Sequence, residues 1–78
     1  MSIWQYIKEG SYSAKVLKII VKRNGLSMSS IPRELKDTTL QVCTMYYRMG
    51  YDAKSAADQV EADFLKTLRD MQNMDRFN

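Results

Sequence analysis

The chain has 78 residues, 45% of them hydrophobic and 27% charged, and its formal net charge is +3. This length predicts one domain near the lower size limit for a core that folds unaided, and the apolar content excludes extensive disorder. A single cysteine excludes an internal disulfide framework, and every apolar run is far shorter than the ~20 residues that span a bilayer.

The N-terminal segment predicts a short first helix over Ile3–Glu9. Ser2 is suited to cap this helix, and Trp4 belongs to its apolar side. The pair Gly10-Ser11 follows directly, and we expect it to interrupt the helix.

A second helix is predicted over residues 14–24, with Ser13 as its N-cap. Its apolar residues recur at the spacing of one helix face, and basic residues line the opposite face. The helix is expected to end before Gly25, because glycine is suited to the left-handed position after a helix end. Leu26 is placed to fold back against Val21, as in a Schellman motif. The basic face comprises Lys15, Lys18, Lys22 and Arg23.

The segment Thr38–Gly50 is apolar on nearly all sides when it is wound as a helix, and we predict that it is the central and most buried helix of the domain. A helix that is apolar on most sides has to be covered by its own chain or by a partner. Before it, Ser27–Lys36 is expected to be a loop with one helical turn after Pro32. The apolar residues of this helix, which cover most of its circumference, are Leu40, Val42, Cys43, Met45, Tyr46, Tyr47 and Met49.

The last helical region is predicted over Asp52–Gln72, with Asp52 as its N-cap. Its apolar residues lie on one side throughout, so the periodicity allows a single helix. Two helices are also possible, one over Ala53–Val60 and another that begins at Asp63.

A shift of the sequence by 25 residues aligns two parts of the chain. The shift places Gly25 on Gly50 and Leu26 on Tyr51. Self-similarity at such a period is typical of stacked helical repeats, in which no unit buries its own apolar face. On this interpretation Asp63 begins a separate helix. The other apolar pairs are Leu17 with Val42, Val21 with Tyr46, Ile31 with Ala56, Leu35 with Val60 and Cys43 with Leu68.

The first copy contains a recognisable motif. Asn24-Gly25 is followed, after five residues, by Ile31-Pro32 and then by Glu34-Leu35. This N-G-x5-[IV]-P-x-E-L pattern resembles a family of short tandem helical repeats of unknown function. The resemblance covers roughly residues 14–74 and implies an α-helical repeat, without implying any catalytic or binding residue. The second copy departs from the pattern at Met49 and Ala57, which stand in place of its Asn and Pro.

These patterns together predict an all-α fold, a small compact bundle of four or five helices built from about two and a half stacked helix-turn repeats. An array of so few repeats must cover both of its ends, which we expect the two terminal segments to do. The predicted single domain divides into an N-terminal cap, a first repeat, a second repeat, a half repeat and a tail, at residues 1–12, 13–37, 38–62, 63–74 and 75–78.

The residue inventory argues against an enzyme. The chain has no histidine, which is the commonest general base and metal ligand. Cys43 lies within the apolar arc of the central helix, where a free cysteine is ordinarily a small core residue, and no base is evident to activate it. We therefore expect no catalytic residue, no metal site and no cofactor.

The leading functional hypothesis is protein binding. Five tyrosines, six methionines and one tryptophan are many adaptable contacts for a small chain, and such residues are favoured at interfaces. We expect an adaptor or stoichiometric inhibitor of a larger protein or complex, of the kind found as phage or mobile-element accessory factors. No signal-peptide pattern is evident, so a cytoplasmic monomer or homodimer that does not enter a membrane is expected. The candidate contact residues are Tyr47, Tyr51, Trp4 and Tyr12.

The alternative hypothesis is nucleic-acid binding through the basic face. Lysines clustered on one helix face can contact phosphates and would make affinity depend on salt. The ordinary interpretation of such a cluster, which we favour, is the solvated side of an amphipathic helix. A recognition helix over Ala53–Val60 is disfavoured, because acidic residues flank this segment and would repel the phosphate backbone.

Overall fold

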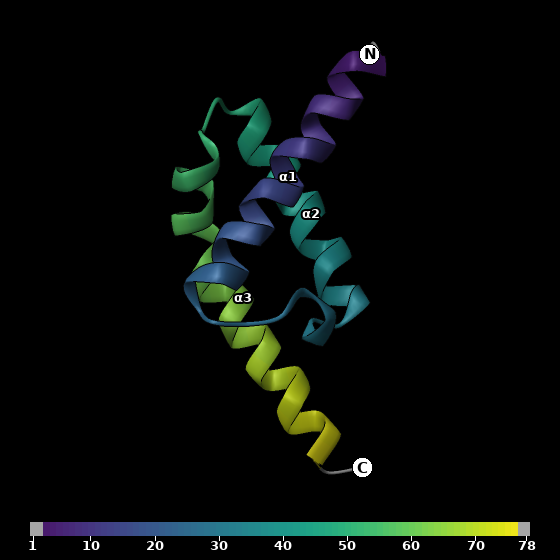
Figure 1. The fold of residues 1–78 in the computed structure, drawn as a ribbon, viewed down its shortest axis with the longest axis vertical. Helices are drawn as coiled ribbons and strands as arrows, with labels where there is room; N and C mark the ends of the chain where they lie inside the picture. Colours follow the sequence, from purple (N-terminus) through teal and green to yellow (C-terminus); the bar gives the residue numbers. More distant parts are fainter. Residues whose placement is uncertain (1–2, 77–78) are drawn as a thin grey trace.

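The computed structural model describes the backbone of residues 3–76 and the side chains of residues 8–73. The described chain forms three α-helices, α1 (Ile3–Arg23), α2 (Arg33–Arg48) and α3 (Ala53–Arg76), with a short 3₁₀ helix, η1 (Met28–Ser30), between the first two. The chain runs along α1, returns along α2 and reverses again in α3 (Figure 1). The fold is therefore all-α, as predicted, but it has three helices where four or five were expected.

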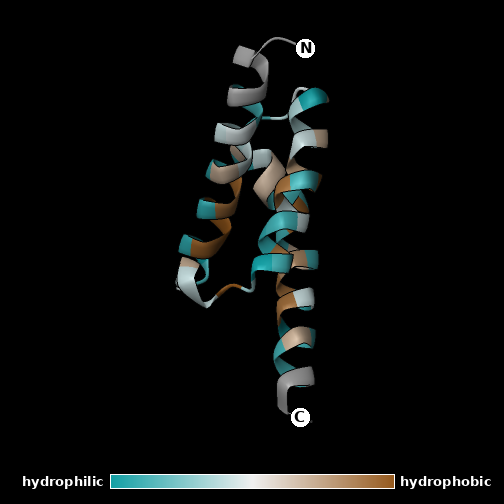
Figure 2. Ribbon diagram, turned by 90° about the vertical axis from the view of Figure 1, so that its right-hand side faces the viewer, coloured by the Kyte–Doolittle hydropathy of each residue, from teal (hydrophilic) through white to brown (hydrophobic). Residues whose placement is uncertain are grey.

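A shared apolar core holds the three helices together, and each helix packs against both others. The hydrophobic residues concentrate where the helices face one another (Figure 2). Withdrawal of this surface from water is the main source of stability for such a fold. Among the described residues, the buried apolar ones are Val16, Leu17, Ile20, Val21, Ile31, Leu35, Cys43, Ala56, Ala57, Val60, Phe64 and Leu68.

Helix α1 continues through Gly10, so the predicted break at Gly10-Ser11 is wrong. A glycine inside a helix costs about 1 kcal/mol relative to alanine, which weakens a helix without ending it. Glu9 and Ser13 lie one turn apart on either side of this glycine, and both are buried. The packed face of α1 therefore continues across Gly10, and Ser13 is an interior residue of α1 rather than the N-cap of a second helix.

Helix α2 begins at Arg33, one turn earlier than predicted. Pro32 occupies its N-cap position, and the Pro32 carbonyl accepts a hydrogen bond from the Lys36 N–H over 3.1 Å. The single helical turn expected after Pro32 is thus the first turn of α2. Proline is compatible with this position because the first N–H groups of a helix have no partner within the helix.

Helix α2 is not the most buried helix, contrary to the prediction for Thr38–Gly50. Its buried side chains are Leu35, Thr39 and Cys43, which form a single row at i, i+4 spacing. Helices α1 and α3 cover that row. The apolar side of α2 next to this row stays at the surface, where the exposed fractions of Val42, Met45 and Met49 are 37%, 62% and 63%.

Helix α3 is one helix, so of the two alternatives for this region the single helix is confirmed, and Asp63 does not begin a separate helix as the repeat interpretation expected. Its N-cap is Asp52, as predicted: the Ser55 N–H donates to Asp52 Oδ1 over 2.7 Å, and this bond lowers the pKa of the Asp52 carboxyl. Asp63 lies inside α3 because a row of buried residues at i, i+4 spacing continues on both sides of it. That row comprises Ala56, Val60, Phe64 and Leu68.

Gly25 and Gly50 end α1 and α2 in the same way, as predicted. Their φ angles are +63° and +87°, in the left-handed region that glycine adopts without strain. The N–H that follows each glycine donates to the carbonyl five residues earlier, which defines a Schellman motif. These bonds run from Leu26 to Val21 over 2.9 Å and from Tyr51 to Tyr46 over 3.1 Å.

Burial follows the 25-residue shift along α2 and α3 but not between α1 and α2. Leu17 and Ile20 of α1 are buried, whereas the corresponding Val42 and Met45 of α2 are exposed. The two helices that come after α1 in the sequence, α2 and α3, both pack against it and cover its apolar side. Helix α2 is followed by α3 alone in the described chain, so the corresponding side of α2 is less covered. The pairs that are buried in both members are Ile31 and Ala56, Leu35 and Val60, Thr39 and Phe64, and Cys43 and Leu68.

Candidate functional site

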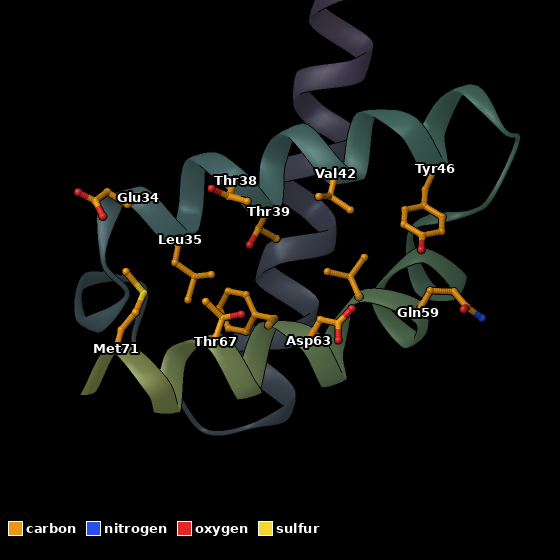
Figure 3. A pocket seen from close by; sticks show the side chains of 12 residues that line it. Glu34, Leu35, Thr38, Thr39, Val42, Tyr46, Gln59, Asp63, Thr67 and Met71 are labelled. Carbon is orange, nitrogen blue, oxygen red and sulfur yellow. The ribbon is translucent and has the colours of Figure 1, made fainter. Parts of the chain in front are cut away.

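A groove of about 310 Å³ lies between α2 and α3. Figure 3 shows α1 crossing behind this pair of helices, so the groove opens on the side of the pair that α1 leaves uncovered. Each wall is a row of side chains at i, i+4 spacing, which places them on one face of their helix. The walls comprise Glu34, Thr38, Val42 and Tyr46 from α2, and Gln59, Asp63, Thr67 and Met71 from α3.

The floor of the groove belongs to the core. Leu35 and Thr39 reach it from α2, and Val60 and Phe64 reach it from α3. All four side chains are buried, with exposed fractions of 7% or less. The floor is thus part of the packed core that α2 and α3 share with α1, which suits a preformed binding surface.

The two sides of the groove are related by the 25-residue shift. Every lining residue of α3 stands 25 positions after a lining residue of α2, from Gln59 after Glu34 to Met71 after Tyr46. The two helices run in opposite directions, so Tyr46 lies above Gln59 at one end and Glu34 lies above Met71 at the other (Figure 3). Residues 25 positions apart therefore occupy corresponding places on the two walls, but they lie at opposite ends of the groove rather than face to face.

The groove is mostly apolar, and the charges in it have one sign. Its walls also carry polar groups, which are threonine hydroxyls and the Gln59 amide. Glu34 and Asp63 contribute carboxylates, and no lysine or arginine occurs among the described residues that line it. A cleft lined by charges of one sign and by apolar walls favours ligands of the opposite sign.

An exposed apolar row extends the α2 wall beyond the groove. Val42, Met45 and Met49 follow one another at i+3 and i+4 spacing, so they share one face of α2. The methionines are among the most exposed large hydrophobic residues of the described chain. Contiguous exposed apolar surface marks interaction sites in many soluble proteins, and methionine adapts its shape to different partners.

The tyrosines predicted as partner contacts have packing contacts within the fold. The rings of Tyr12 and Tyr47 meet edge to face with centroids 5.1 Å apart, and the Tyr12 hydroxyl donates to the Asp52 carbonyl over 3.3 Å. The Tyr51 ring packs on Tyr46, with centroids 5.2 Å apart, and is 38% exposed. The side chain of Trp4 lies outside the described side chains.

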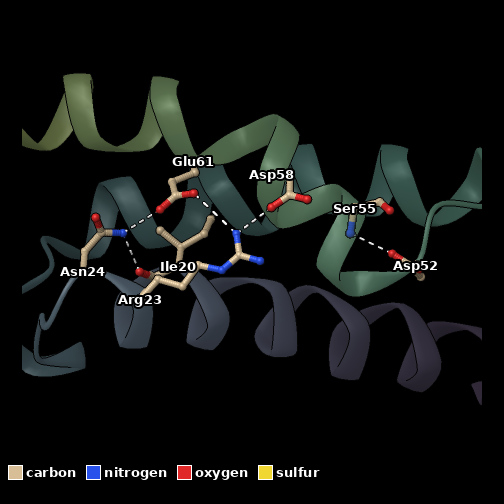
Figure 4. A network of polar contacts seen from close by, with 7 residues as sticks. All are labelled: Ile20, Arg23, Asn24, Asp52, Ser55, Asp58 and Glu61. Atoms are coloured by element: carbon tan, nitrogen blue, oxygen red, sulfur yellow. Dashed lines mark hydrogen bonds and ion pairs between the residues drawn. The ribbon is translucent and has the colours of Figure 1, made fainter.

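The predicted basic face divides into two parts. Lys15, Lys18 and Lys22 are exposed on α1. Arg23 instead joins α1 to α3: its Nη1 lies 2.6 Å from Asp58 Oδ1 and 3.4 Å from Glu61 Oε2 (Figure 4). Its guanidinium is therefore engaged within the protein, and the sequence pattern had not distinguished it from the three lysines.

The motif residue Asn24 takes part in the same network. Its Nδ2 donates to Glu61 Oε1 over 2.9 Å and to the Ile20 carbonyl over 2.8 Å (Figure 4). One amide thus satisfies a carbonyl at the end of α1 and binds a carboxylate of α3. Together with the left-handed Gly25 and the N-cap Pro32, it gives the N-G and P positions of the motif local structural roles.

Comparison with known proteins adds nothing to these observations. No protein-family model, no curated protein and no solved structure matches this chain. The resemblance of the first copy to short tandem helical repeats therefore stays a prediction.

A second, smaller hollow of about 230 Å³ lies between α1 and α2, and sequence reasoning had not anticipated it. Glu9 and Ser13 line it, and the buried Ser13 Oγ has no hydrogen-bond partner among the described residues. The Glu9 carboxylate pairs with Arg48, with Nε and Oε1 3.2 Å apart. The i, i+4 spacing of Glu9 and Ser13 was the available signal, but the pair Gly10-Ser11 was interpreted as a break between two helices.

Cys43 is fully buried, and burial raises the pKa of its thiol to about 11. The thiolate, which is the reactive form, is therefore scarce near neutral pH. Within the described residues, no three His, Cys, Asp or Glu side chains are grouped so that they could hold a metal ion. No described helix combines the length and the apolar character needed to cross a membrane.

Proposed function

We propose that this protein is a non-enzymatic module that binds another protein through the groove between α2 and α3. The observation that carries this proposal is the exposed row of Val42, Met45 and Met49, which begins at the groove and extends beyond it along α2. When a partner removes exposed apolar side chains from water, the complex is stabilised by about 25 cal/mol per Å² of buried apolar surface. An adaptor or a stoichiometric inhibitor needs such a surface and no catalytic group.

We also infer that α2 and α3 are two copies of one helical repeat. The three buried residue pairs within these helices and the two matching groove walls support this inference. Repeat proteins bind partners on surfaces formed by neighbouring units, and a groove between two copies is such a surface.

Site-directed photo-crosslinking tests the proposed function. A benzophenone amino acid at Met45 or Met49 should form adducts of defined mass with a partner protein in a lysate of the source organism. The same group at Ala62, an exposed position of α3 outside the groove lining, is the control and should give none of these adducts.

A charge variant then tests whether the groove itself makes the contact. Val42→Glu combined with Met49→Glu should abolish the adducts formed at Met45. The folded state should persist, because substitution of exposed residues usually changes stability by less than about 0.5 kcal/mol. Adducts that survive in this variant, or that form equally at Ala62, would contradict the proposal.

Nucleic-acid binding is the second candidate, and the exposure of Lys15, Lys18 and Lys22 favours it. Three ammonium groups on one helix face can meet successive phosphates. Arg23 would contribute little, because Asp58 and Glu61 already neutralise its charge. The proposal of protein binding takes precedence because apolar surface dominates the groove and its charges would repel phosphates.

A further inference from the structure

We infer that the groove accepts a single amphipathic α-helix of another protein that carries lysine or arginine beside its apolar stripe. This inference rests on the proposed function and names the class of partner for the same site. Its basis is the shape of the groove, the composition of its floor and the sign of its charges.

The shape fits one helix. The wall residues of α2 extend from Glu34 to Tyr46, which corresponds to a length of about 18 Å at 1.5 Å per residue. A helix of about 12 to 16 residues would fill this length. Helix α1 already packs against both α2 and α3 from the other side of the pair. The docked helix would therefore complete a four-helix arrangement in which both sides of the α2–α3 pair are covered.

The floor requires an apolar stripe on the partner. Val60 and Phe64 offer apolar side chains at the bottom of the groove, and Val42 offers one on its wall. Met45 and Met49 continue this surface along α2. Apolar residues at i, i+3, i+4 and i+7 of a helix would meet these positions in succession, which is the usual way in which a helix binds a groove.

The charges require basic residues next to that stripe. Glu34 and Asp63 place carboxylates on opposite walls, and no cation among the described lining residues neutralises them. An apolar helix without basic residues would desolvate these carboxylates with no compensation. Lysine or arginine on both flanks of the stripe would pair with them, and this complementarity selects the partner.

A second copy of this chain fits the groove less well. Two copies that meet groove to groove would bring Glu34 and Asp63 of one against the same carboxylates of the other. Like charges placed together at an interface cost free energy. The basic helix α1 cannot enter the groove of another copy either, because its own apolar residues Val16 and Ile20 are fully buried in the core.

Matched synthetic peptides test the inference directly. One 16-residue peptide has a leucine and alanine stripe flanked by lysines, and the other has glutamates in place of the lysines. Calorimetric titration of the full chain at low salt should give a Kd at least about tenfold lower for the lysine peptide. Backbone amide shifts from a ¹⁵N-labelled sample should cluster on the facing sides of α2 and α3.

Two variants identify the carboxylates responsible. In the double variant Glu34→Gln/Asp63→Asn, the preference for the lysine peptide should fall to less than about threefold. The control Asp37→Asn removes an exposed carboxylate of α2 that does not line the groove, and it should leave the preference unchanged.

Each contrary result has a distinct meaning. Equal binding of both peptides, binding of neither peptide, or shifts confined to α1 would overturn the basic-helix inference. A dimer in sedimentation that dissociates on Val42→Glu would also overturn it, in favour of a second copy. Crosslinking at Met45 that the groove variant abolishes would still uphold protein binding, so the two proposals fail separately.

Discussion

The Nε atom of Arg48 lies 3.2 Å from Oε1 of Glu9, and this ion pair joins the N-terminal half of α1 to the last turn of α2. The Glu9 side chain is only 6% exposed, whereas that of Arg48 is 58% exposed. The buried Glu9 carboxylate therefore needs the Arg48 guanidinium as its partner, because a charge taken out of water is costly unless it is paired. The exposed guanidinium needs the carboxylate much less, since water solvates it.

We predict that Arg48→Met destabilises the protein by about 1–2 kcal/mol, which is below the usual range for fully buried pairs because Arg48 is partly solvated. Glu9→Gln should restore part of this loss in the double variant. Urea denaturation measures both effects. The control is Arg33→Met, which removes a 92% exposed partner of Asp37 and should have little effect. An equal cost for the two arginine substitutions would contradict the structural role of Glu9.

Substitution of the three glycines by alanine should lower stability at two positions and raise it at the third. Gly25→Ala and Gly50→Ala should each destabilise by about 1 kcal/mol, because a side chain is strained at their positive φ angles. Gly10→Ala should stabilise by up to about 1 kcal/mol, because Gly10 is inside α1 and an added Cβ meets no atom within 4 Å. Thermal unfolding of the three variants tests this, and destabilisation by Gly10→Ala would contradict a continuous α1.

Cys43 should react slowly with a disulfide reagent in the folded protein at neutral pH and quickly after unfolding. Its folded-state pKa of about 11 lies above its ordinary value of 9.0. The unfolded chain therefore loses the thiol proton first as pH rises, so the stabilisation is complete below pH 9 and is lost between about pH 9 and pH 11.

The comparison with Cys43→Ala isolates this effect from the titration of tyrosines. The stability of the wild-type protein should fall relative to the variant above pH 9, with a slope of at most about 1.4 kcal/mol per pH unit. Parallel stability curves up to pH 11, or rapid labelling of the folded protein, would contradict the buried position of the thiol.

The lysines of α1 separate the two candidate functions. The triple variant Lys15→Gln/Lys18→Gln/Lys22→Gln should keep its fold, because all three side chains are exposed. We expect no mobility shift of DNA or RNA, in duplex or single-stranded form, by wild-type protein at micromolar concentration and low salt. Tight, salt-sensitive binding that the triple variant loses would instead favour nucleic-acid binding.

The sequence by itself determined the all-α class, the C-terminal ends of α1 and α2 and the start of α3. Gly25, Gly50 and Asp52 act within a few residues of their own position, through a left-handed backbone or one side-chain hydrogen bond. Such local effects are visible in sequence because they need no information about distant parts of the chain. The 25-residue shift is equally visible in sequence, and it relates the lining residues of the two groove walls.

Only the tertiary structure decided where helices continue and which sides they cover. Gly10 and Asp63 are weak local signals for a break, and packing of the buried rows across them outweighs a cost of about 1 kcal/mol or less. The exposure of Met45 beside the groove likewise depends on where α1 and α3 lie, because an apolar helix face has the same pattern whether or not a neighbour covers it. Burial of Glu9 depends on Arg48, 39 residues away, which no local pattern relates to it.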